Sequence, residues 1–193
     1  MNIGIYVYPN AEVLDFAGPF EVFSTANRLA ERKDAINVFL VSEKPGLLLA
    51  RGGLQIAPHY SFADHPDIDV LIVVGGVHDE EMSKAPVLAW IAAQSASSKI
   101  TASVCTGVFL LAGAGVVTDQ RVTTHWQDIA DLKMQFPALQ VCEGVRWVDC
   151  GAVVSSAGIS AGIDMSLHLV ARLRSLDLAR QTAKQMEFDW SAT

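Results

Sequence analysis

The sequence predicts an α/β fold with a mostly parallel sheet that helices cover on both faces. Short apolar, β-branched runs alternate with longer segments of helical periodicity. The run DVLIVV at residues 69–74 is apolar throughout, as expected for a strand covered on both faces. The residues are 51% hydrophobic, which suits one well-buried core. A length of 193 residues is too short for two ordinary domains. We therefore expect a single domain over residues 1–193.

The amino-terminal half is expected to contain three strands, one helix and a short extended segment. In the helical segment, apolar side chains recur at helical spacing, and Pro19 suits its first turn. A Gly-Gly pair precedes the fourth segment, and the pair Gly75-Gly76 ends the fifth. The expected segments are strand 2–7, helix 19–32, strand 37–42, a short extended segment 54–57 and strand 69–74.

The carboxyl-terminal half continues the alternation and ends in helices. The expected segments are helix 86–96, strand 99–104, helix 107–113, a hairpin over 141–156 with strands VRWVD and AVVSS, and helices 161–174 and 176–188. In parallel α/β sheets, ligands gather at the carboxyl ends of strands near a topological switch point. Such ends include the loop after the first strand, Gly75-Gly76 and Cys105.

Composition excludes several classes of function. A formal net charge of −7 argues against a nucleic-acid-binding face, which needs clustered Lys and Arg. We expect no membrane span, because no run of about 18 apolar residues occurs, and the start MNIGIYVYP does not resemble a secretory signal. The three cysteines suggest neither a disulfide framework nor a metal site. We therefore expect a soluble cytoplasmic protein with reduced thiols.

Cys105 stands between an apolar strand and an apolar helix in ITASVCTGVFLLAGAG. This junction is similar to a nucleophile elbow, in which a sharp turn exposes the reactive side chain. The helix N-terminus offers unpaired N–H groups and a partial positive charge, which favour the nucleophilic thiolate. The alternative is a buried structural cysteine. For Cys142 and Cys150, which we expect to lie within strands near the hairpin, we favour that alternative.

Asp15 lies in EVLDFAGPFEVF, among apolar residues just before the expected helix. A carboxyl group in apolar surroundings has a raised pKa and can carry a proton near neutral pH, which suits an acid–base partner for a thiol. The alternative is an aspartate that caps the helix. Glu21, inside the expected helix, is a weaker candidate for the same role.

Four further positions complete the candidate site. The backbone N–H groups of Gly75 and Gly76 could stabilise a developing anion, although an ordinary tight turn is the alternative. Thr106 follows the cysteine and could donate a hydrogen bond through its hydroxyl or its backbone. His125-Trp126, in VTTHWQD, could line a pocket, but a single histidine is more often structural or exposed.

Taken together, the chain resembles the DJ-1/PfpI superfamily, which is related to the class I glutamine amidotransferase fold, along essentially its whole length. The matching pieces are LDFAGPFEVF, DVLIVVGG, SVCTGVFLLAGAG, TTHW and SSAGISAGIDMSLHLV. SVCTG with TTHW and AGID is similar to the branch that holds isocyanide (isonitrile) hydratases and the amidase-like domains of AraC-type regulators. The resemblance implies a flavodoxin-like three-layer sandwich with a nucleophile elbow, often as a homodimer.

By resemblance to isocyanide hydratase, Cys105 matches the nucleophile, Asp15 the acid–base carboxylate and Thr106 the residue beside the nucleophile. The implied hydro-lyase reaction adds water to R–N≡C through a thioimidate on the cysteine and gives an N-substituted formamide. It needs no metal or organic cofactor. Protease-like and amidase-like members carry His where this chain has Thr106, which disfavours a peptidase or amidase mechanism.

Three hypotheses therefore compete. The first is an enzyme, either a hydratase or one that acts on another small electrophile such as a reactive carbonyl. The second is a non-catalytic domain that senses a small molecule, as in AraC-type regulators, and we expect no DNA-binding module within this sequence. The third is a redox protein whose cysteine is oxidised. The presence of both Asp15 and Cys105 favours the enzyme, because a binding domain needs neither.

Overall fold

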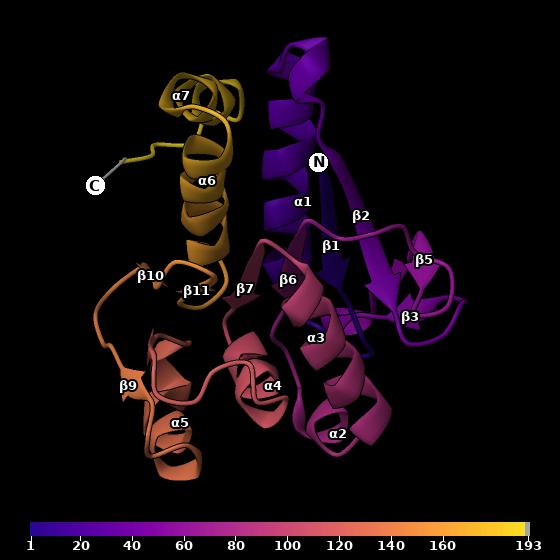
Figure 1. Ribbon diagram of the computed structural model, residues 1–193, viewed down its shortest axis with the longest axis vertical. Coiled ribbons are helices and arrows are strands. Elements are labelled where there is room, and N and C mark those ends of the chain that lie inside the picture. Colours follow the sequence, from indigo (N-terminus) through magenta and orange to yellow (C-terminus); the bar gives the residue numbers. More distant parts are fainter. Residues whose placement is uncertain (192–193) are drawn as a thin grey trace.

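The computed structural model describes residues 1–191, in which a seven-stranded sheet forms the centre of the molecule (Figure 1). The strand order is β10-β11-β7-β6-β1-β2-β5, and all neighbours are parallel except the antiparallel pair β10 and β11. The predicted α/β class is confirmed. The strands are β1 (Asn2–Tyr6), β2 (Asn37–Ser42), β5 (Tyr60–Ser61), β6 (Val70–Val73), β7 (Ile100–Val104), β10 (Trp147–Asp149) and β11 (Val153–Ser156).

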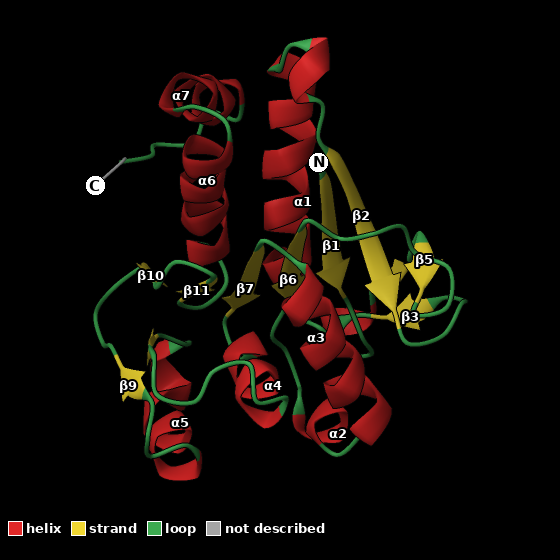
Figure 2. Cartoon of the chain, viewed as in Figure 1, coloured by secondary structure: helices red, strands yellow, loops and turns green. Residues whose placement is uncertain are grey.

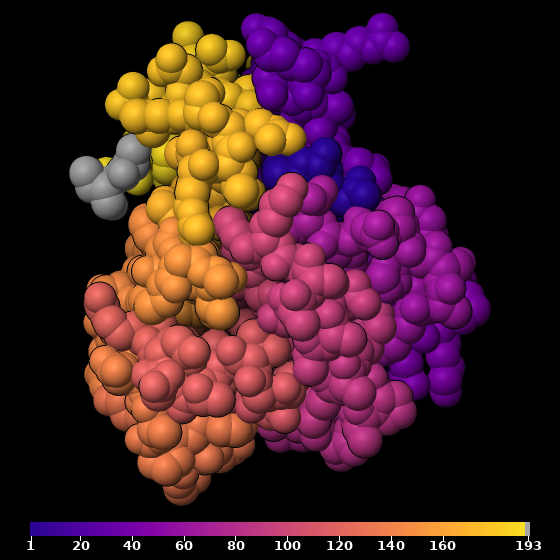
Figure 3. Space-filling view, viewed as in Figure 1, coloured from indigo at the N-terminus to yellow at the C-terminus, as the bar shows by residue number. Residues whose placement is uncertain are grey.

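The larger helices fall into two groups, with the strands between them (Figure 1). In the first group, α1 (Val13–Leu29) packs against α6 (Ala161–Leu173) and α7 (Leu176–Gln185). The end of α1 and the carboxyl-terminal helices therefore lie side by side at one end of the molecule (Figure 3). In the second group, α2 (Asp79–Met82), α3 (Ala85–Ser97) and α4 (Gly107–Gly113) contact one another.

Smaller elements stand outside the main sheet (Figure 2). Strands β3 (Leu48–Leu49) and β4 (Gln55–Ile56) form a short hairpin, and β8 (Arg121–Val122) pairs with β9 (Gln140–Val141) beside helix α5 (Ile129–Gln135). Single 3-10 turns occupy Arg32–Asp34, Arg51–Gly53 and Trp126–Asp128. Across residues 1–191, no helix combines the length and the apolar character that crossing a bilayer requires.

The topology brings three loops together. From β1 the chain passes through α1 to β2 on one side, whereas from β6 it passes through α3 to β7 on the other side. The neighbours β1 and β6 therefore form the switch point of the sheet, where a crevice opens at the carboxyl ends of the strands. The loops after β1, β6 and β7 are the three places that the sequence marked as candidate ligand sites.

The first helix differs most from its prediction. It begins at Val13 rather than residue 19 and ends at Leu29, so Pro19 lies inside it. Proline has no N–H to donate to the carbonyl four residues earlier, so this helix lacks that internal bond. The residue before a proline normally avoids helical conformation, but here it is Gly18, which lacks the Cβ that would clash. Asp15 therefore lies in the first turn of α1.

The carboxyl-terminal half contains one helix and one strand pair that the sequence analysis did not predict. Two cysteines also lie outside the strands in which they were expected. Helix α5 and the β8–β9 pair lie within residues 121–141, and all of these except Val141, the first residue of the expected hairpin, lie outside the predicted segments. Cys142 follows β9 and is half-buried, and Cys150 follows β10 and is exposed. Neither lies within a strand, and the exposure of Cys150 contradicts the interpretation of a buried structural cysteine.

Gly107 allows α4 to approach the sheet, and we predict that it tolerates no side chain. A Cβ at this position would lie 2.1 Å from the carbonyl oxygen of Val73, a backbone atom that cannot rotate away. We expect Gly107→Ala to lower the free energy of unfolding by about 2–3 kcal/mol in urea denaturation. Gly113→Ala on the same helix is the control, because its Cβ would come close only to the flexible end of Met82 and would meet Leu88 at ordinary contact distance. Equal stability of the two variants would contradict the packing argument.

Candidate active site

Cys105 occupies a sharp turn between β7 and α4. Its backbone is in the left-handed region, with φ of 55°, which side-chain-bearing residues adopt at a cost. Bonds from both sides hold this turn: the Cys105 N–H donates to the carbonyls of Ser156 (3.2 Å) and Ala157 (3.3 Å), and the Thr124 hydroxyl donates to the Cys105 carbonyl (2.9 Å). The geometry is that of an elbow, with the side chain only 7% exposed.

Asp15 reaches the same place from α1 and is fully buried. The Gly75 N–H donates to its Oδ2 at 3.1 Å. Its Oδ1 is buried and accepts no hydrogen bond of normal geometry from any residue in the described part of the chain. The N-cap of α1 is Glu12, so Asp15 does not cap the helix. A buried carboxyl oxygen left without a partner is costly, which points to a role other than stability.

Burial raises the pKa of Asp15 to about 7. The nearby Glu12 carboxylate adds to the increase. The Gly75 N–H opposes it, as do the Cys105 thiol and the Ile159 N–H, which face the carboxyl group. The sequence-based expectation of a carboxyl group that can hold a proton near neutral pH therefore agrees with this environment.

The environment of Cys105 differs from the one expected. Burial raises the pKa of its thiol, and the negative charge of Asp15 raises it further. The N–H groups of Thr106 and Ile159 face the sulfur and pull the pKa down, but more weakly. Helix α4 has only seven residues, so the partial positive charge at its N-terminus does not outweigh the effect of burial on the thiol pKa. At rest the pair therefore holds its proton mainly on sulfur, beside a carboxylate that can accept it.

The raised pKa of Asp15 predicts a pH-dependent stability. The native carboxyl binds its proton more tightly than the unfolded one, so its contribution is fully present below about pH 4 and is lost as the pH rises through about 7. We expect Asp15→Asn to match the wild type at low pH and to exceed its free energy of unfolding by up to about 4 kcal/mol above pH 8. Denaturant titrations of both proteins across this range test it, and parallel curves would contradict it.

Thr106, Gly75 and Gly76 form the wall beside this pair. The Gly76 N–H donates to the Thr106 Oγ1 at 3.0 Å, and that oxygen lies 3.1 Å from the Gly76 carbonyl. A Cβ on Gly75 would approach the Thr106 nitrogen to 2.6 Å and Asp15 Oδ2 to 2.9 Å, so only glycine fits. The N–H groups of both glycines thus serve contacts within the protein, unlike the expectation that they face a ligand.

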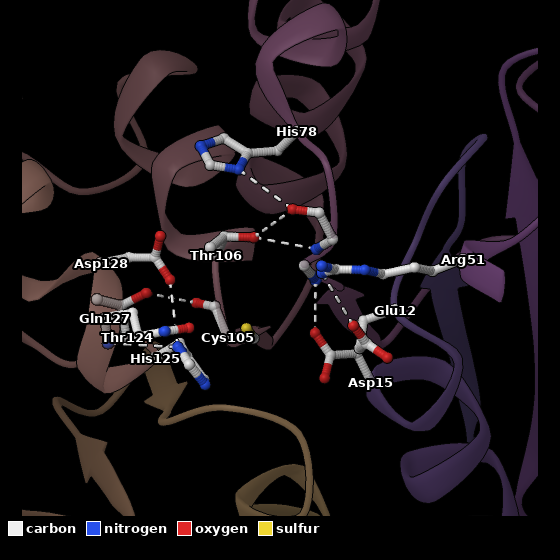
Figure 4. A network of polar contacts seen from close by, with 12 residues as sticks. Glu12, Asp15, Arg51, His78, Cys105, Thr106, Thr124, His125, Gln127 and Asp128 are labelled. Carbon is white, nitrogen blue, oxygen red and sulfur yellow. Dashed lines mark hydrogen bonds and ion pairs between the residues drawn. The ribbon is translucent and has the colours of Figure 1, made fainter.

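A pocket of about 550 Å³ opens above the sulfur. Two polar contacts flank it on opposite sides (Figure 4): the ion pair of Arg51 with Glu12 at 3.2 Å, and His125 Nδ1 beside the Asp128 carboxylate at 3.4 Å. The lining residues come from the loops after β1, β6, β7 and β8 and from the two segments around Arg51 and Ile159; they are Glu12, Arg51, Gly76, Val77, His78, Asp79, Cys105, Thr106, His125, Gln127, Asp128 and Ile159.

The predicted pocket residues His125 and Trp126 separate. The His125 ring lines the pocket of Cys105 and packs on Gly158, where a Cβ would lie 2.0 Å from its Cδ2. The Trp126 side chain is 75% exposed and lies outside this pocket, in the groove next to it. Glu21, the second candidate acid, is exposed and paired with Arg28, away from the pocket.

Several pocket residues carried no signal in the sequence. Glu12 and Arg51 lie far apart along the chain and meet only through the fold. Ile159 is apolar, yet its backbone N–H faces both the carboxyl and the thiol, with φ of 53°. Asp128 could have been suspected from its position three residues after His125. Within residues 1–191, no group of three or more His, Cys, Asp or Glu side chains is arranged to hold a metal ion.

The DJ-1/PfpI family model matches residues 1–172. The isonitrile hydratase of Pseudomonas putida is 34% identical over 189 residues, which cover 97% of this chain and 78% of that protein. The HTH-type transcriptional regulator GbdR of Pseudomonas aeruginosa is 27% identical over 188 residues, which cover 97% of this chain. The chain spans about half the length of that regulator, 51%.

Solved structures of related proteins share this fold. A THiJ/PfpI family protein from Pseudomonas syringae superposes with a TM-score of 0.86 at 30% identity, covering 97% of this chain and 75% of its own. DJ-1beta of Drosophila melanogaster (TM-score 0.82, 19% identity, 97% and 98% covered) and an AraC family transcriptional regulator from Pseudomonas putida (0.80, 22%, 96% and 98%) share the fold.

Proposed function

The chain belongs to the DJ-1/PfpI family, and from that premise we propose that it is a cysteine-dependent hydratase that adds water to an isocyanide and releases an N-substituted formamide. The observation that carries the proposal is the buried Asp15 carboxyl group facing the Cys105 thiol, with its Oδ1 accepting no hydrogen bond of normal geometry. A pure binding domain would gain nothing from burying this pair at such cost.

In the first step, the Cys105 sulfur attacks the terminal carbon of R–N≡C. Asp15 takes the thiol proton and delivers it to that carbon, which gives the thioimidate R–N=CH–S–Cys. The Thr106 and Ile159 N–H groups face the sulfur and stabilise the negative charge that develops on it during proton transfer. The left-handed turn at Cys105 keeps the sulfur fixed for this attack.

In the second step, Asp15 removes a proton from a water molecule that attacks the thioimidate carbon. Asp15 passes that proton to the nitrogen. The tetrahedral intermediate R–NH–CH(OH)–S–Cys then expels the sulfur, which takes up the proton that the hydroxyl group releases as it becomes the carbonyl. The products are R–NH–CHO and free Cys105, so the sum is R–N≡C plus one water. Protein residues and water supply every group that these steps use.

Thr106 is proposed as a positioning residue. Its hydroxyl is bound to the backbone of Gly76, and its N–H faces the sulfur, so it fixes the turn next to the nucleophile. A histidine in this position could supply a base for amide hydrolysis, and a threonine cannot. A peptidase or amidase activity is therefore not proposed.

The test is formamide production from a simple alkyl isocyanide and a simple aryl isocyanide, followed by chromatography. Accumulation of the matching formamide with saturation kinetics supports the proposal. Absence of formamide from both substrates would refute it and would favour the second candidate function.

That second candidate is a sensing domain, as in regulators of the AraC type. The observation in its favour is the similarity to HTH-type regulators across almost the whole chain. In such a role the pocket would bind a small molecule without consuming it, in a homodimer or through a partner protein. Binding without turnover, measured by calorimetry, distinguishes this function from the hydratase. In either function, we expect a reducing compartment such as the cytoplasm to keep Cys105 a thiol.

A further inference from the structure

A second concave region continues from the reactive pocket and has no part in the steps described above. This groove has a volume of about 650 Å³ and is lined by segments 123–126, 143–146 and 157–160 together with Ile129. It shares two residues with the pocket of Cys105, namely His125 and Ile159. These two side chains therefore form the boundary across which a bound molecule would extend from one space into the other.

The groove presents apolar surface at its rim. The Trp126 indole is 75% exposed, and Val145 and Ile159 are exposed to 38% and 37%. The rings of His125 and Trp126 lie 5.7 Å apart, so an aromatic wall runs from the edge of the reactive pocket into the groove. Exposed large apolar side chains that gather along one concave surface are typical of ligand-binding grooves.

The charged groups along the groove are already compensated. Arg146 is paired with Asp164 and also donates to the Ser160 hydroxyl, and Glu143 is paired with Lys133. At the boundary, His125 is next to Asp128. A charged ligand would have to compete with these existing partners, whereas a neutral apolar group would only displace water from Trp126 and its neighbours.

We infer that this groove is the subsite for the N-substituent of the substrate and that it selects neutral, extended apolar substituents, with Trp126 as the main contact. The inference rests on the proposed hydratase function. An isocyanide is linear at its nitrogen, so when its terminal carbon is at the Cys105 sulfur its substituent is carried straight away from the sulfur. We therefore expect a methyl group to end inside the pocket and a benzyl group to extend past His125 and Ile159 into the groove.

The test compares kcat/KM for benzyl isocyanide with kcat/KM for methyl isocyanide. In Trp126→Ala, this ratio is expected to fall about tenfold, as for the loss of one large apolar contact. Met134→Ala is the matched control, because Met134 is equally exposed (72%), lies nearby on α5 and lines neither space. The control should keep the wild-type ratio. A ratio that Trp126→Ala leaves unchanged would overturn the inference.

A binding measurement separates this inference from the proposed function. In the Cys105→Ala background, N-benzylformamide is expected to bind more tightly than N-methylformamide, and Trp126→Ala should weaken only the benzyl compound, by about tenfold. If neither isocyanide is turned over, the hydratase proposal fails. The calorimetric result alone then decides whether the groove binds the apolar substituent. If turnover occurs but Trp126→Ala binds N-benzylformamide as well as its parent does, the groove assignment fails and the hydratase remains.

Discussion

Replacing Cys105 with serine is expected to reduce formamide production by at least about 10⁴-fold, because removal of a covalent nucleophile eliminates the route through the thioimidate. A serine hydroxyl is a much weaker nucleophile, and the proton acceptor beside it has a pKa of only about 7. The fold should persist, since the substitution exchanges one atom in a site whose turn is held by backbone bonds. Steady-state assays with an aryl isocyanide measure the loss.

Cys150→Ser is the matched control for this change. Cys150 is a free thiol like Cys105, but it is exposed and lies outside the reactive pocket. We expect it to retain the wild-type rate. A residual rate in Cys105→Ser within tenfold of the wild type would exclude covalent catalysis at this residue. Mass spectrometry of the wild type during turnover would show the thioimidate as an adduct of one substrate molecule.

Asp15→Asn is expected to lower kcat/KM by about 10²–10⁴-fold, the usual contribution of a positioned acid–base group. The amide can still accept the Gly75 N–H, but it cannot take a proton from the thiol or from water. The wild-type kcat/KM should rise with pH through about 7, as the carboxyl group ionises. The residual activity of Asp15→Asn should lack this step.

Glu21→Gln provides the control on the same helix. Its carboxylate is exposed and paired with Arg28, so its removal should leave both the rate and the pH profile unchanged. If Asp15→Asn kept the wild-type step near pH 7, the titrating group would be another residue of the pocket. The same ionisation that activates the base is expected to weaken the native state, so activity and stability should change in opposite directions through this range.

The fold was predictable to the extent that its elements have regular patterns. The buried runs that became β2, β6 and β7 were predicted within a residue or two, and α4 matched its prediction. The predicted start of α1 was wrong because proline normally marks the first turn of a helix, whereas Pro19 lies inside this one. The two-residue strands have no periodicity at all, and they form only where tertiary contacts pair them.

The candidate site was predictable where the type of a residue indicates its chemistry. Cys105 and Asp15 stood out as polar groups between apolar segments, and the topology brought their loops together. Ile159 could not be found in this way, because its contribution is a backbone N–H whose direction depends on a left-handed turn. The direction of the Cys105 pKa also required the structure, since burial and the Asp15 charge, rather than the short helix, determine it.

The left-handed backbone at Cys105 has a consequence for how this sequence can change over time. Glycine would occupy that conformation without strain, whereas cysteine carries a cost of roughly 1 kcal/mol. Drift in a copy that no longer needs a thiol should therefore replace this residue by glycine or asparagine and gain stability. Among similar sequences, we therefore expect cysteine at this position in catalysts, and glycine or asparagine in domains that only bind a ligand.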